Sequence, residues 1–281
     1  MNAVRVLVTG ATGRLGPYLG RAASRLGQVV AVSRGNESMG CDLTRPHVVQ
    51  RMLRDVAPAI VIHAAGWTDV DGCEANPVLA HLTNCSSISN IVASLTPSVR
   101  LVFISTDQVY PNDRGPHVEG TEAPVNVYGK TKLAGELAAL SHPRTLVLRV
   151  NFFGPSGAAD RPSISDFVTD KLSNREPVTF FEDVKFSPLH MTTLADLVLD
   201  AIDEELTGVF NVGSRDGMSK RDFAFAVARH LNLPTDTAQT GRSTDYPARA
   251  RRPLDLRMDV TKFETHLGKA MPTLREEIRK L

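Results

Sequence analysis

The chain opens with the apolar run Val4-Arg5-Val6-Leu7-Val8, which leads directly into Thr9-Gly10-Ala11-Thr12-Gly13-Arg14-Leu15-Gly16. The run predicts a buried strand and the residues after it predict a helix, so the glycines fall in the turn between the two. There Gly10 allows a tight turn, Gly13 lets the backbone approach a pyrophosphate, and Gly16 allows close packing of the helix. The helix amino terminus favours an anion. We therefore expect a dinucleotide-binding turn, the alternative being a glycine-rich turn that binds nothing.

Short β-branched runs alternate with amphipathic stretches over residues 1–150. The predicted strands are Val4–Val8, Gln28–Val32, Ala59–His63, Arg100–Ile104 and Thr145–Val150. The predicted helices are Leu15–Leu26, Arg45–Val56, Pro77–Leu95 and Val127–Leu140. Because each strand is almost entirely apolar, helices should cover both faces of the sheet. The fold class expected is α/β, with residues 1–150 forming a doubly wound parallel Rossmann sheet, the dinucleotide-binding domain.

Residues 151–281 follow a different pattern, which opens with the Gly/Pro/Ser-rich stretch from Gly154 to Pro162. Helices near Ser163–Leu172, Thr193–Glu204 and Ser219–His230, strands near Val178–Phe181 and Gly208–Val212, an arginine-rich loop and a terminal helix are expected. We interpret this half as a smaller, mainly substrate-binding C-terminal lobe, with segments near 184–213 returning to the Rossmann sheet.

Composition excludes several classes of partner. The 281 residues carry a formal net charge of +1, with 42% hydrophobic and 22% charged residues, so neither nucleic acid nor a membrane surface is expected. No apolar run approaches a membrane span, and the first one is too short for a signal peptide. Cys41, Cys73 and Cys85 lack metal-ligand spacing and the eight histidines are scattered. We expect a cytoplasmic protein with reduced thiols and no metal site.

The end of the second strand bears on the choice of cofactor. Ser33-Arg34 stands where an NAD-selective protein usually places an acidic residue for the ribose hydroxyls. An arginine there suits the 2′-phosphate of NADP, and Arg14 can assist it. We therefore expect NADP(H) to be favoured over NAD(H). Asp42, followed by Leu43, is expected either beside the adenine or as a helix cap.

Tyr128 and Lys132 stand four residues apart in a predicted helix and share one of its faces. Tyrosine, with a pKa of about 10, is a poor acid–base group at neutral pH until a cation favours its phenolate. Lys132 can supply that charge and also bond the nicotinamide ribose. Thr106, at the end of the fourth strand, can donate to a substrate oxygen on which charge develops. The alternative is a tyrosine and a lysine exposed on a surface helix.

Three stretches carry a family resemblance: Val61-Ile62-His63-Ala64-Ala65-Gly66-Trp67-Thr68-Asp69-Val70-Asp71, Ile104-Ser105-Thr106-Asp107-Gln108-Val109-Tyr110, and Asn126-Val127-Tyr128-Gly129-Lys130-Thr131-Lys132-Leu133-Ala134-Gly135-Glu136. They resemble the extended short-chain dehydrogenase/reductase superfamily and, within it, the dTDP-4-dehydrorhamnose reductase family. Arg252-Pro253 followed by Met258-Asp259 is similar to the closing motif of that family. The resemblance runs over nearly the whole chain and is densest from about residue 59 to 150.

The resemblance implies NAD(P)H-dependent reduction of the 4-keto group of a nucleotide-linked 6-deoxysugar. Tyr128 would deliver the proton, Thr106 would hold the keto oxygen, and Lys132 would orient the ribose, while Asn84 would help to pack the lysine region. The expected substrate-binding residues are Thr106, Asp107, Gln108, Asn151, Phe152 and Arg252. The expected cofactor-binding residues are Gly10, Thr12, Gly13, Arg14, Leu15, Gly16, Ser33, Arg34, Asp42, Leu43, Ala64, Ala65, Gly66, Tyr128 and Lys132.

The sequence departs from the family on the substrate side. Gln108 replaces an aromatic residue, Arg149-Val150-Asn151-Phe152-Phe153 replaces a Trp-containing segment, Phe186-Ser187-Pro188-Leu189-His190 replaces Pro-Thr, and Leu256 replaces a small polar residue. These changes leave open which sugar and nucleotide are bound. The sequence also leaves open the stereochemistry of the product, homodimer formation and a role for Mg²⁺.

Two other functions stay open. One is a nucleotide-sugar epimerase of the same superfamily, and the other is a non-catalytic NADP-binding subunit resembling the regulatory subunit of methionine adenosyltransferase. A 4,6-dehydratase is disfavoured, because Gln108 stands where those enzymes place a glutamate base. The arginine-rich stretch is expected either to bind a diphosphate or to form a solvated loop; its members are Arg242, Arg249, Arg251, Arg252 and Arg257.

Overall fold

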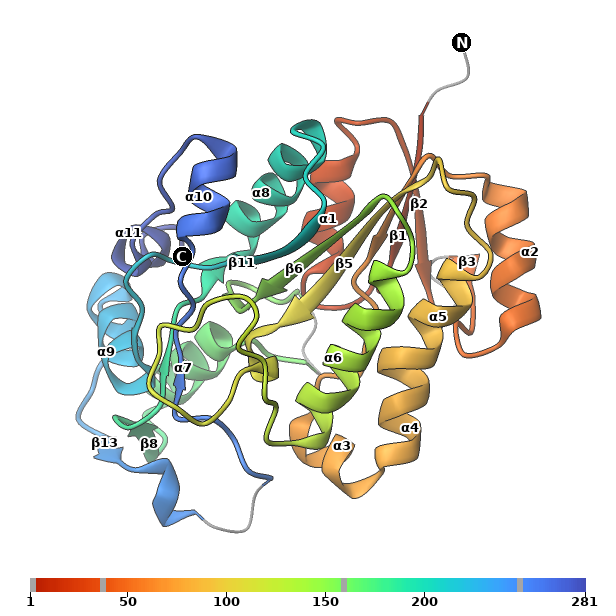
Figure 1. The fold of residues 1–281 in the computed structure, drawn as a ribbon. Coiled ribbons are helices and arrows are strands. Elements are labelled where there is room, and N and C mark those ends of the chain that lie inside the picture. Colours follow the sequence, from red (N-terminus) through yellow and green to blue (C-terminus); the bar gives the residue numbers. More distant parts are fainter. Residues whose placement is uncertain (1–3, 36–38, 158–160, 247–249) are drawn as a thin grey trace.

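A parallel sheet of seven strands runs through the part of the chain that this computed structural model describes, residues 4–35, 39–157, 161–246 and 250–281 (Figure 1). The strands are β1 (Arg5–Thr9), β2 (Gln28–Ser33), β3 (Met39–Gly40), β4 (Ile60–His63), β5 (Arg100–Thr106), β6 (Thr145–Val150) and β11 (Gly208–Val212). Their order is β11-β6-β5-β4-β1-β2-β3, with every neighbouring pair parallel. The predicted doubly wound parallel sheet is confirmed.

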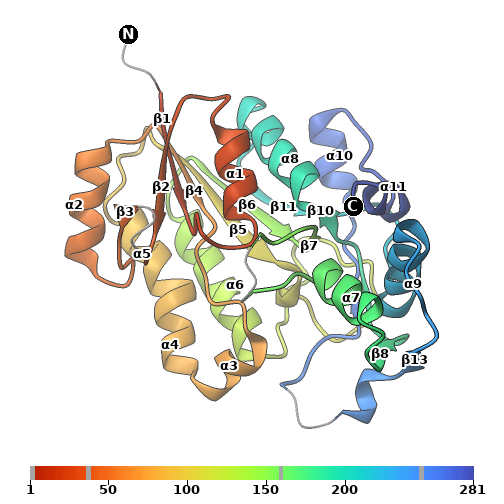
Figure 2. The ribbon, with the colours of Figure 1, turned by 180° about the vertical axis from the view of Figure 1, so that it is seen from behind.

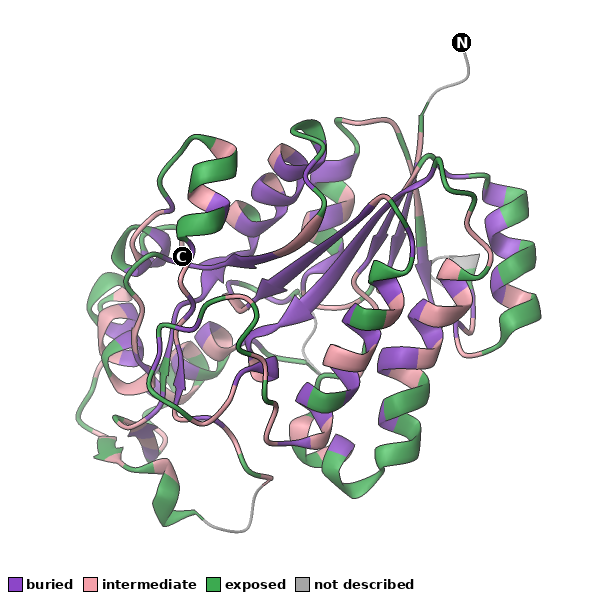
Figure 3. Ribbon diagram, viewed as in Figure 1, coloured by how far each residue is buried: buried purple, intermediate pink, exposed green. Residues whose placement is uncertain are grey.

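Helices cover both faces of this sheet (Figures 1 and 2). The first face is covered by α1 (Gly16–Ala23) and α8 (Met191–Asp203), and the second by α2 (Pro46–Val56), α5 (Ser87–Val92) and α6 (Val127–Leu140). Successive side chains of a strand point to opposite faces, so Val6 and Val8 pack in the first layer and Leu7 packs in the second. Both faces are apolar for this reason, and Figure 3 shows the strands buried between helices whose outer sides are exposed.

The predicted helix Pro77–Leu95 is helical from Pro77 to Val92, with a π-helical turn inside it. It is divided into α4 (Pro77–His81), a π-helical turn η1 (Leu82–Ser86) and α5. The π turn holds the buried side chain of Asn84, whose amide bonds the backbone of Trp67. π turns of this kind occur where a helix is adjusted for a local contact. A short helix α3 (Val70–Ala75) precedes α4 and has too few apolar residues to be predicted from periodicity.

The remaining elements form the C-terminal lobe and its connections. The helices are α7 (Ile164–Ser173), α9 (Lys220–Leu231), α10 (Thr261–Leu267) and α11 (Leu274–Ile278), with 3₁₀ turns η2 (Asp107–Val109) and η3 (Ser243–Asp245). The strands are β7 (Phe152–Phe153), β8 (Val178–Phe181), β9 (Lys185–Phe186), β10 (Leu189–His190), β12 (Met218–Ser219), β13 (Ala238–Gly241) and β14 (Asp255–Leu256). The lobe core includes Phe153, Phe180, Phe186 and Phe223. The single terminal helix expected from the sequence is two short helices, α10 and α11.

Within residues 184–213, Gly208–Val212 joins the large sheet as its edge strand β11. By contrast, β9 pairs with β12 and β14, and β10 pairs with β7, outside the large sheet. Helix α8 lies between these strands and β11 in the chain and packs on the first face of the sheet. No helix in the described ranges is long and apolar enough to cross a membrane.

The strand order reverses next to β1, because β2 and β4 lie on its two sides. In open parallel sheets a ligand crevice forms outside the carboxyl ends of the strands at such a reversal. The glycine-rich turn begins at the carboxyl end of β1, so the fold places it at this crevice.

Candidate active site

The turn after β1 has the geometry that its glycines predict. Gly10 has a φ of +72°, and a β-carbon there would lie 2.7 Å from the backbone nitrogen of Ala65. A β-carbon on Gly16 would lie 2.3 Å from the Gly10 carbonyl oxygen. Helix α1 begins after Leu15 with a proline in its first turn and no side-chain cap. Its amino terminus is therefore left to other acceptors, as a bound pyrophosphate requires.

Two adjoining cavities lie over this turn. The first cavity has a volume of about 830 Å³ and the second about 330 Å³, and both are lined by Gly10, Gly13, Arg34, Ala64, Gly66 and Arg161. Of the predicted cofactor residues, the first cavity is also lined by Arg14, Leu15, Gly16, Tyr128 and Lys132. The second is also lined by Thr12, Ser33, Asp42, Leu43 and Ala65. The structure thus brings every predicted cofactor residue to the walls of two cavities that share six lining residues.

Residues that follow β2 line part of the second cavity. Arg34 lies on its wall, and the Ser33 hydroxyl accepts from the Gly35 backbone at 3.3 Å. Asp42 also lies on the wall, and its carboxylate accepts from the backbone and hydroxyl of Thr44 at 3.1 and 2.7 Å. The two expectations for Asp42 therefore coexist: it holds a local turn and it faces the cavity. These bonds hold the pKa of Asp42 below its usual value.

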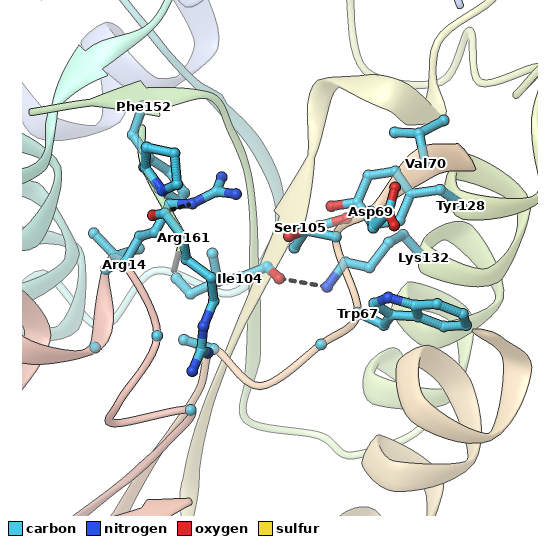
Figure 4. A pocket seen from close by; sticks show the side chains of 18 of the residues that line it. Arg14, Trp67, Asp69, Val70, Ile104, Ser105, Tyr128, Lys132, Phe152 and Arg161 are labelled. Atoms are coloured by element: carbon cyan, nitrogen blue, oxygen red, sulfur yellow. Dashed lines mark hydrogen bonds between the residues drawn. The ribbon is translucent and has the colours of Figure 1, made fainter. Parts of the chain in front are cut away.

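The catalytic pair lies on the wall of the first cavity. Helix α6 begins after Asn126, whose side chain accepts from the Gly129 backbone at 2.8 Å, and this cap places Tyr128 in the first turn. One turn further, Lys132 Nζ donates to the Ile104 carbonyl at 2.7 Å, which is the dashed line in Figure 4. The ammonium also lies 4.2 Å from the centre of the Phe103 ring.

Burial shifts the pKa values of both groups. It lowers the pKa of Lys132 to about 8, against the opposing effect of the Glu136 carboxylate. It raises the pKa of Tyr128 above its usual value, against the opposing hydrogen bond with Thr106. Tyr128 therefore carries its proton at neutral pH, whereas Lys132 exchanges its proton close to neutrality. Such a pair is suited to delivering a proton to a substrate oxygen.

Thr106, Asp107 and Asn151 lie at or directly after the carboxyl ends of β5 and β6 and are joined to one another beside the catalytic pair, with the Thr106 hydroxyl in hydrogen-bond contact with Tyr128. The Thr106 hydroxyl donates to Asp107 at 3.1 Å, and Asn151 donates to the other carboxylate oxygen. The 3₁₀ turn η2 buries Asp107 directly after β5. Burial raises the pKa of Asp107 to about 6, against the opposing bonds from Asn151 and Thr106. The bonds from Thr106 and Asn151 therefore hold Asp107 in place, and Thr106 connects this group to Tyr128.

Asn84 connects the loop after β4 to the catalytic helix. Its amide group donates to the Trp67 carbonyl and to the Thr131 hydroxyl, both at 3.1 Å, and it accepts from the Trp67 backbone at 2.7 Å. Thr131 precedes Lys132 in the chain, so the structure gives Asn84 the packing position that the family resemblance implies. A β-carbon on Gly66 would lie 3.2 Å from the Asn84 side chain, so this loop position has little room for a side chain.

Several wall residues are absent from the sequence-based set. In the first cavity they are Trp67, Thr68, Asp69, Val70, Ile104, Ser105, Arg161 and Pro162. Figure 4 shows Arg14 and Arg161 on the opposite side of the pocket from Tyr128 and Lys132. The loop from Trp67 to Val70 follows the carboxyl end of β4, a position from which it could have been predicted. Arg161 comes from the C-terminal lobe, and no local pattern marks it; its carbonyl accepts from Arg14 at 3.2 Å.

A third cavity of about 310 Å³ lies between the sheet domain and the lobe, with Gln108, Lys220, Tyr246, Arg251 and Leu256 among its lining residues. Arg252 lines both this cavity and the first one. Its guanidinium bonds both carboxylate oxygens of Asp71, at 3.1 and 2.8 Å.

The arginines of the arginine-rich stretch lie in different surroundings. Arg257 forms an ion pair with Asp255 at 2.6 Å, whereas Arg251 and Arg252 face the third cavity. Arg242 precedes the short turn η3, and Arg249 lies outside the described residues. In the described ranges, no group of three or more His, Cys, Asp or Glu side chains is arranged to hold a metal ion.

A dinucleotide crevice at the reversal of a parallel sheet, with a Tyr-x-x-x-Lys helix on its wall, defines a protein of the short-chain dehydrogenase/reductase class. Residues 4–281 match the family described as RmlD substrate binding domain, and the chain belongs to that family. The match confirms the resemblance inferred from the sequence.

Similar proteins cover the chain almost from end to end. A Haloferax volcanii protein named probable low-salt glycan biosynthesis reductase Agl14 is 30% identical over 98% of this chain and 96% of its own. The dTDP-4-dehydrorhamnose reductase of Shigella flexneri is 28% identical over 99% and 97%. The crystal structure of dTDP-4-dehydrorhamnose reductase from Bacillus anthracis in complex with NADP has a TM-score of 0.90 and 24% identity, over 99% of this chain and 98% of that one. This last likeness shows the shared fold.

Proposed function

We propose that this protein reduces the 4-keto group of a nucleotide-linked 6-deoxysugar, with NADPH as the reductant. The observation that carries the proposal is that Tyr128 and Lys132 lie on the wall of the same cavity as the glycine turn. The relatives named as reductases, which align over the full length of the chain, support it. They also favour this reading over the epimerase and the non-catalytic subunit.

The residues around the crevice fit a dinucleotide. Gly10 and Gly16 admit no side chain, so the backbone of the turn and the start of α1 would hold the pyrophosphate. Arg34 would bind the 2′-phosphate of NADPH in the second cavity, and its bidentate geometry suits that group. Arg14 and Arg161 would add positive charge at the junction of the two cavities. When bound, the nicotinamide supplies the hydride that becomes the new C–H bond at C4 of the sugar.

The protein side of the reaction is a proton transfer. Tyr128 delivers its phenolic proton to the keto oxygen as that oxygen gains negative charge, so the carbonyl becomes an alcohol. Lys132 holds a positive charge beside the phenolate that results and would orient the ribose of the cofactor. Thr106, which bonds Tyr128 and Asp107, would hold the keto oxygen beside the phenol. The third cavity, which Arg252 connects to the first, would take the nucleotide end of the substrate.

The test is oxidation of NADPH, and separately of NADH, followed by absorbance after addition of a dTDP-4-keto-6-deoxyhexose. We expect oxidation that depends on this substrate and that falls about 100-fold or more in Tyr128→Phe, because the phenolic proton is lost. The fold of the variant is checked by its melting temperature and its NADPH affinity.

Other outcomes identify the competing functions. Sugar interconversion without net oxidation of NADPH would indicate an epimerase. Tight NADPH binding without turnover of any nucleotide sugar would indicate a binding subunit.

A further inference from the structure

A buried carboxylate lies one helical turn beyond the catalytic lysine. Glu136 follows Lys132 by four residues in α6 and is only 1% exposed. It accepts from Arg149 Nε at 3.1 and 3.2 Å and from Arg149 Nη2 at 2.6 Å, and it also accepts from the Ser105 hydroxyl. This carboxylate takes no part in the proton transfer from Tyr128.

The bond to Ser105 reaches the strand segment that holds the catalytic groups. Ser105 lies in β5 between Ile104, whose carbonyl accepts from Lys132, and Thr106, which lies beside Tyr128. Glu136 therefore joins the catalytic helix to the strand at the point where both catalytic side chains have their partners. A shift of α6 along β5 would stretch this bond together with the Lys132–Ile104 bond.

Arg149 extends the network to β11, the edge strand of the large sheet. Its guanidinium, on β6, donates to the Tyr110 hydroxyl at 3.0 Å and to the Glu122 carboxylate. Tyr110 in turn donates to Asn211 of β11 at 2.6 Å. Arg149 is 2% exposed, and burial of its charge is stable only because carboxylates surround it.

The charges in this region are balanced. The positive groups are Lys132 and Arg149, and the negative groups are Glu136 and Glu122. His63 on β4 also lies near Lys132, and burial lowers its pKa to about 3, so it is neutral. Tyr128 and Asp69 line the same cavity as Lys132, and Asp107 and Cys73 lie near Tyr128. Asn84, Phe103 and Trp67, which also face this region, carry no charge.

We propose that Glu136 is a positioning residue of the reductase: it holds the catalytic helix against β5 where Lys132 and Tyr128 have their partners. The inference rests on the proposed function, because it gives Lys132 and Tyr128 their roles in the reaction. Ser105 and Arg149 act through Glu136. Ser105 links the Glu136 carboxylate to β5, and Arg149 compensates the charge of that carboxylate.

The decisive variant is Glu136→Gln, which keeps the shape of the side chain and removes its charge. In the wild-type protein Glu136 raises the pKa of Lys132, so loss of the charge lowers that pKa further below its value of about 8. Lys132 then loses its proton at a lower pH. NADPH affinity and kcat/KM should both fall as Lys132 loses its proton. In Glu136→Gln we expect this fall to begin about one pH unit lower than in the wild type. NADPH affinity is measured by fluorescence titration between pH 6 and 9, without substrate.

Two companion variants separate position from charge. Ser105→Ala breaks the bond to the strand without changing any charge, so kcat should fall about 10-fold while the pH profile stays unchanged. Arg149→Lys keeps the positive charge, so it should retain the wild-type pH profile even where its melting temperature falls. If Glu136→Gln folds poorly, these two variants still test whether the network positions the catalytic groups.

Glu277→Gln is the matched control. Glu277 is also fully buried, accepts from the His190 backbone at 2.8 Å and pairs with Lys280 at 2.6 Å, but it does not line the cavities. We expect a lower melting temperature and an unmoved pH profile. A pH profile that is the same in Glu136→Gln as in the wild type would overturn the positioning role. Absence of turnover in the wild type, with the NADPH profile still shifted in Glu136→Gln, would count against the proposed substrate and not against Glu136.

Discussion

The cofactor side and the substrate side of the crevice differ in where the residues expected from the sequence lie. On the cofactor side, every such residue lies on the wall of the first or second cavity. On the substrate side, Gln108, Phe152 and Arg252 lie on a cavity wall, whereas Thr106, Asp107 and Asn151 bond one another next to Tyr128. The difference shows that the phosphate turn follows from the spacing of a short motif, whereas the substrate side is assembled from separate segments.

The physical reason is the source of the contacts. The phosphate turn depends on backbone dihedral angles and N–H groups, which glycines at fixed spacing determine locally. The substrate side combines η2, β7, the loop around Arg252 and residues near Arg161, which come from distant parts of the chain. Each of these side chains has several possible hydrogen-bond partners, and the folded structure determines which of them it contacts.

The largest expected effect concerns the local turn. Gly16→Ala would place a β-carbon 2.3 Å from the Gly10 carbonyl oxygen, so the turn or α1 must move. We expect kcat/KM to fall by about 100-fold or more, since misplacement of the cofactor by about 1 Å is sufficient for such a loss. NADPH binding should weaken in parallel in a fluorescence titration.

Gly20→Ala is the matched control in the same helix, because a β-carbon there meets no atom within 4 Å. It should leave turnover unchanged and stabilise the protein by about 0.5–1 kcal/mol. Equal behaviour of the two variants would mean that the turn is not determined by the space at Gly16.

A smaller effect is expected for cofactor choice. Arg34→Ala should weaken NADPH binding about 10-fold and leave NADH binding unchanged, because only NADPH carries the 2′-phosphate. The measurement is the ratio of the two dissociation constants. Arg51→Ala, which removes an exposed arginine from α2, should leave that ratio as it is. An equal loss for NADPH and NADH would assign Arg34 to the shared pyrophosphate instead.

The smallest effect is expected on the substrate side. Arg252 lies between the first and third cavities, but Asp71 already occupies two of its bonds. Arg252→Ala should raise KM for the nucleotide sugar about 10-fold and leave NADPH affinity unchanged. Arg229→Ala on the exposed side of α9 is the control. An unchanged KM in a folded variant would place the substrate diphosphate elsewhere and deepen the contrast between the two sides.

The same contrast applies to the fold. The five strands predicted in the first half lie within two residues of β1, β2, β4, β5 and β6, because buried parallel strands are continuous apolar runs, whereas the two-residue strand β3 was not predicted. The π turn at Asn84 and the two-residue strands of the lobe were not predicted, because neither has a period long enough to recognise. The buried Glu136–Arg149 pair was also absent from the sequence-based site, although Glu136 belongs to the stretch that carries the family resemblance.

The sequence by itself determined the phosphate turn, the doubly wound sheet and the shared helix face of Tyr128 and Lys132, since each follows from short-range spacing and the direction of side chains. Only the tertiary structure decided that Arg161 reaches the cofactor crevice, that Arg252 pairs with Asp71, and that Asp107 is buried next to Tyr128. These contacts join residues from different segments, and their stability depends on desolvation and on competing hydrogen bonds that no local pattern contains.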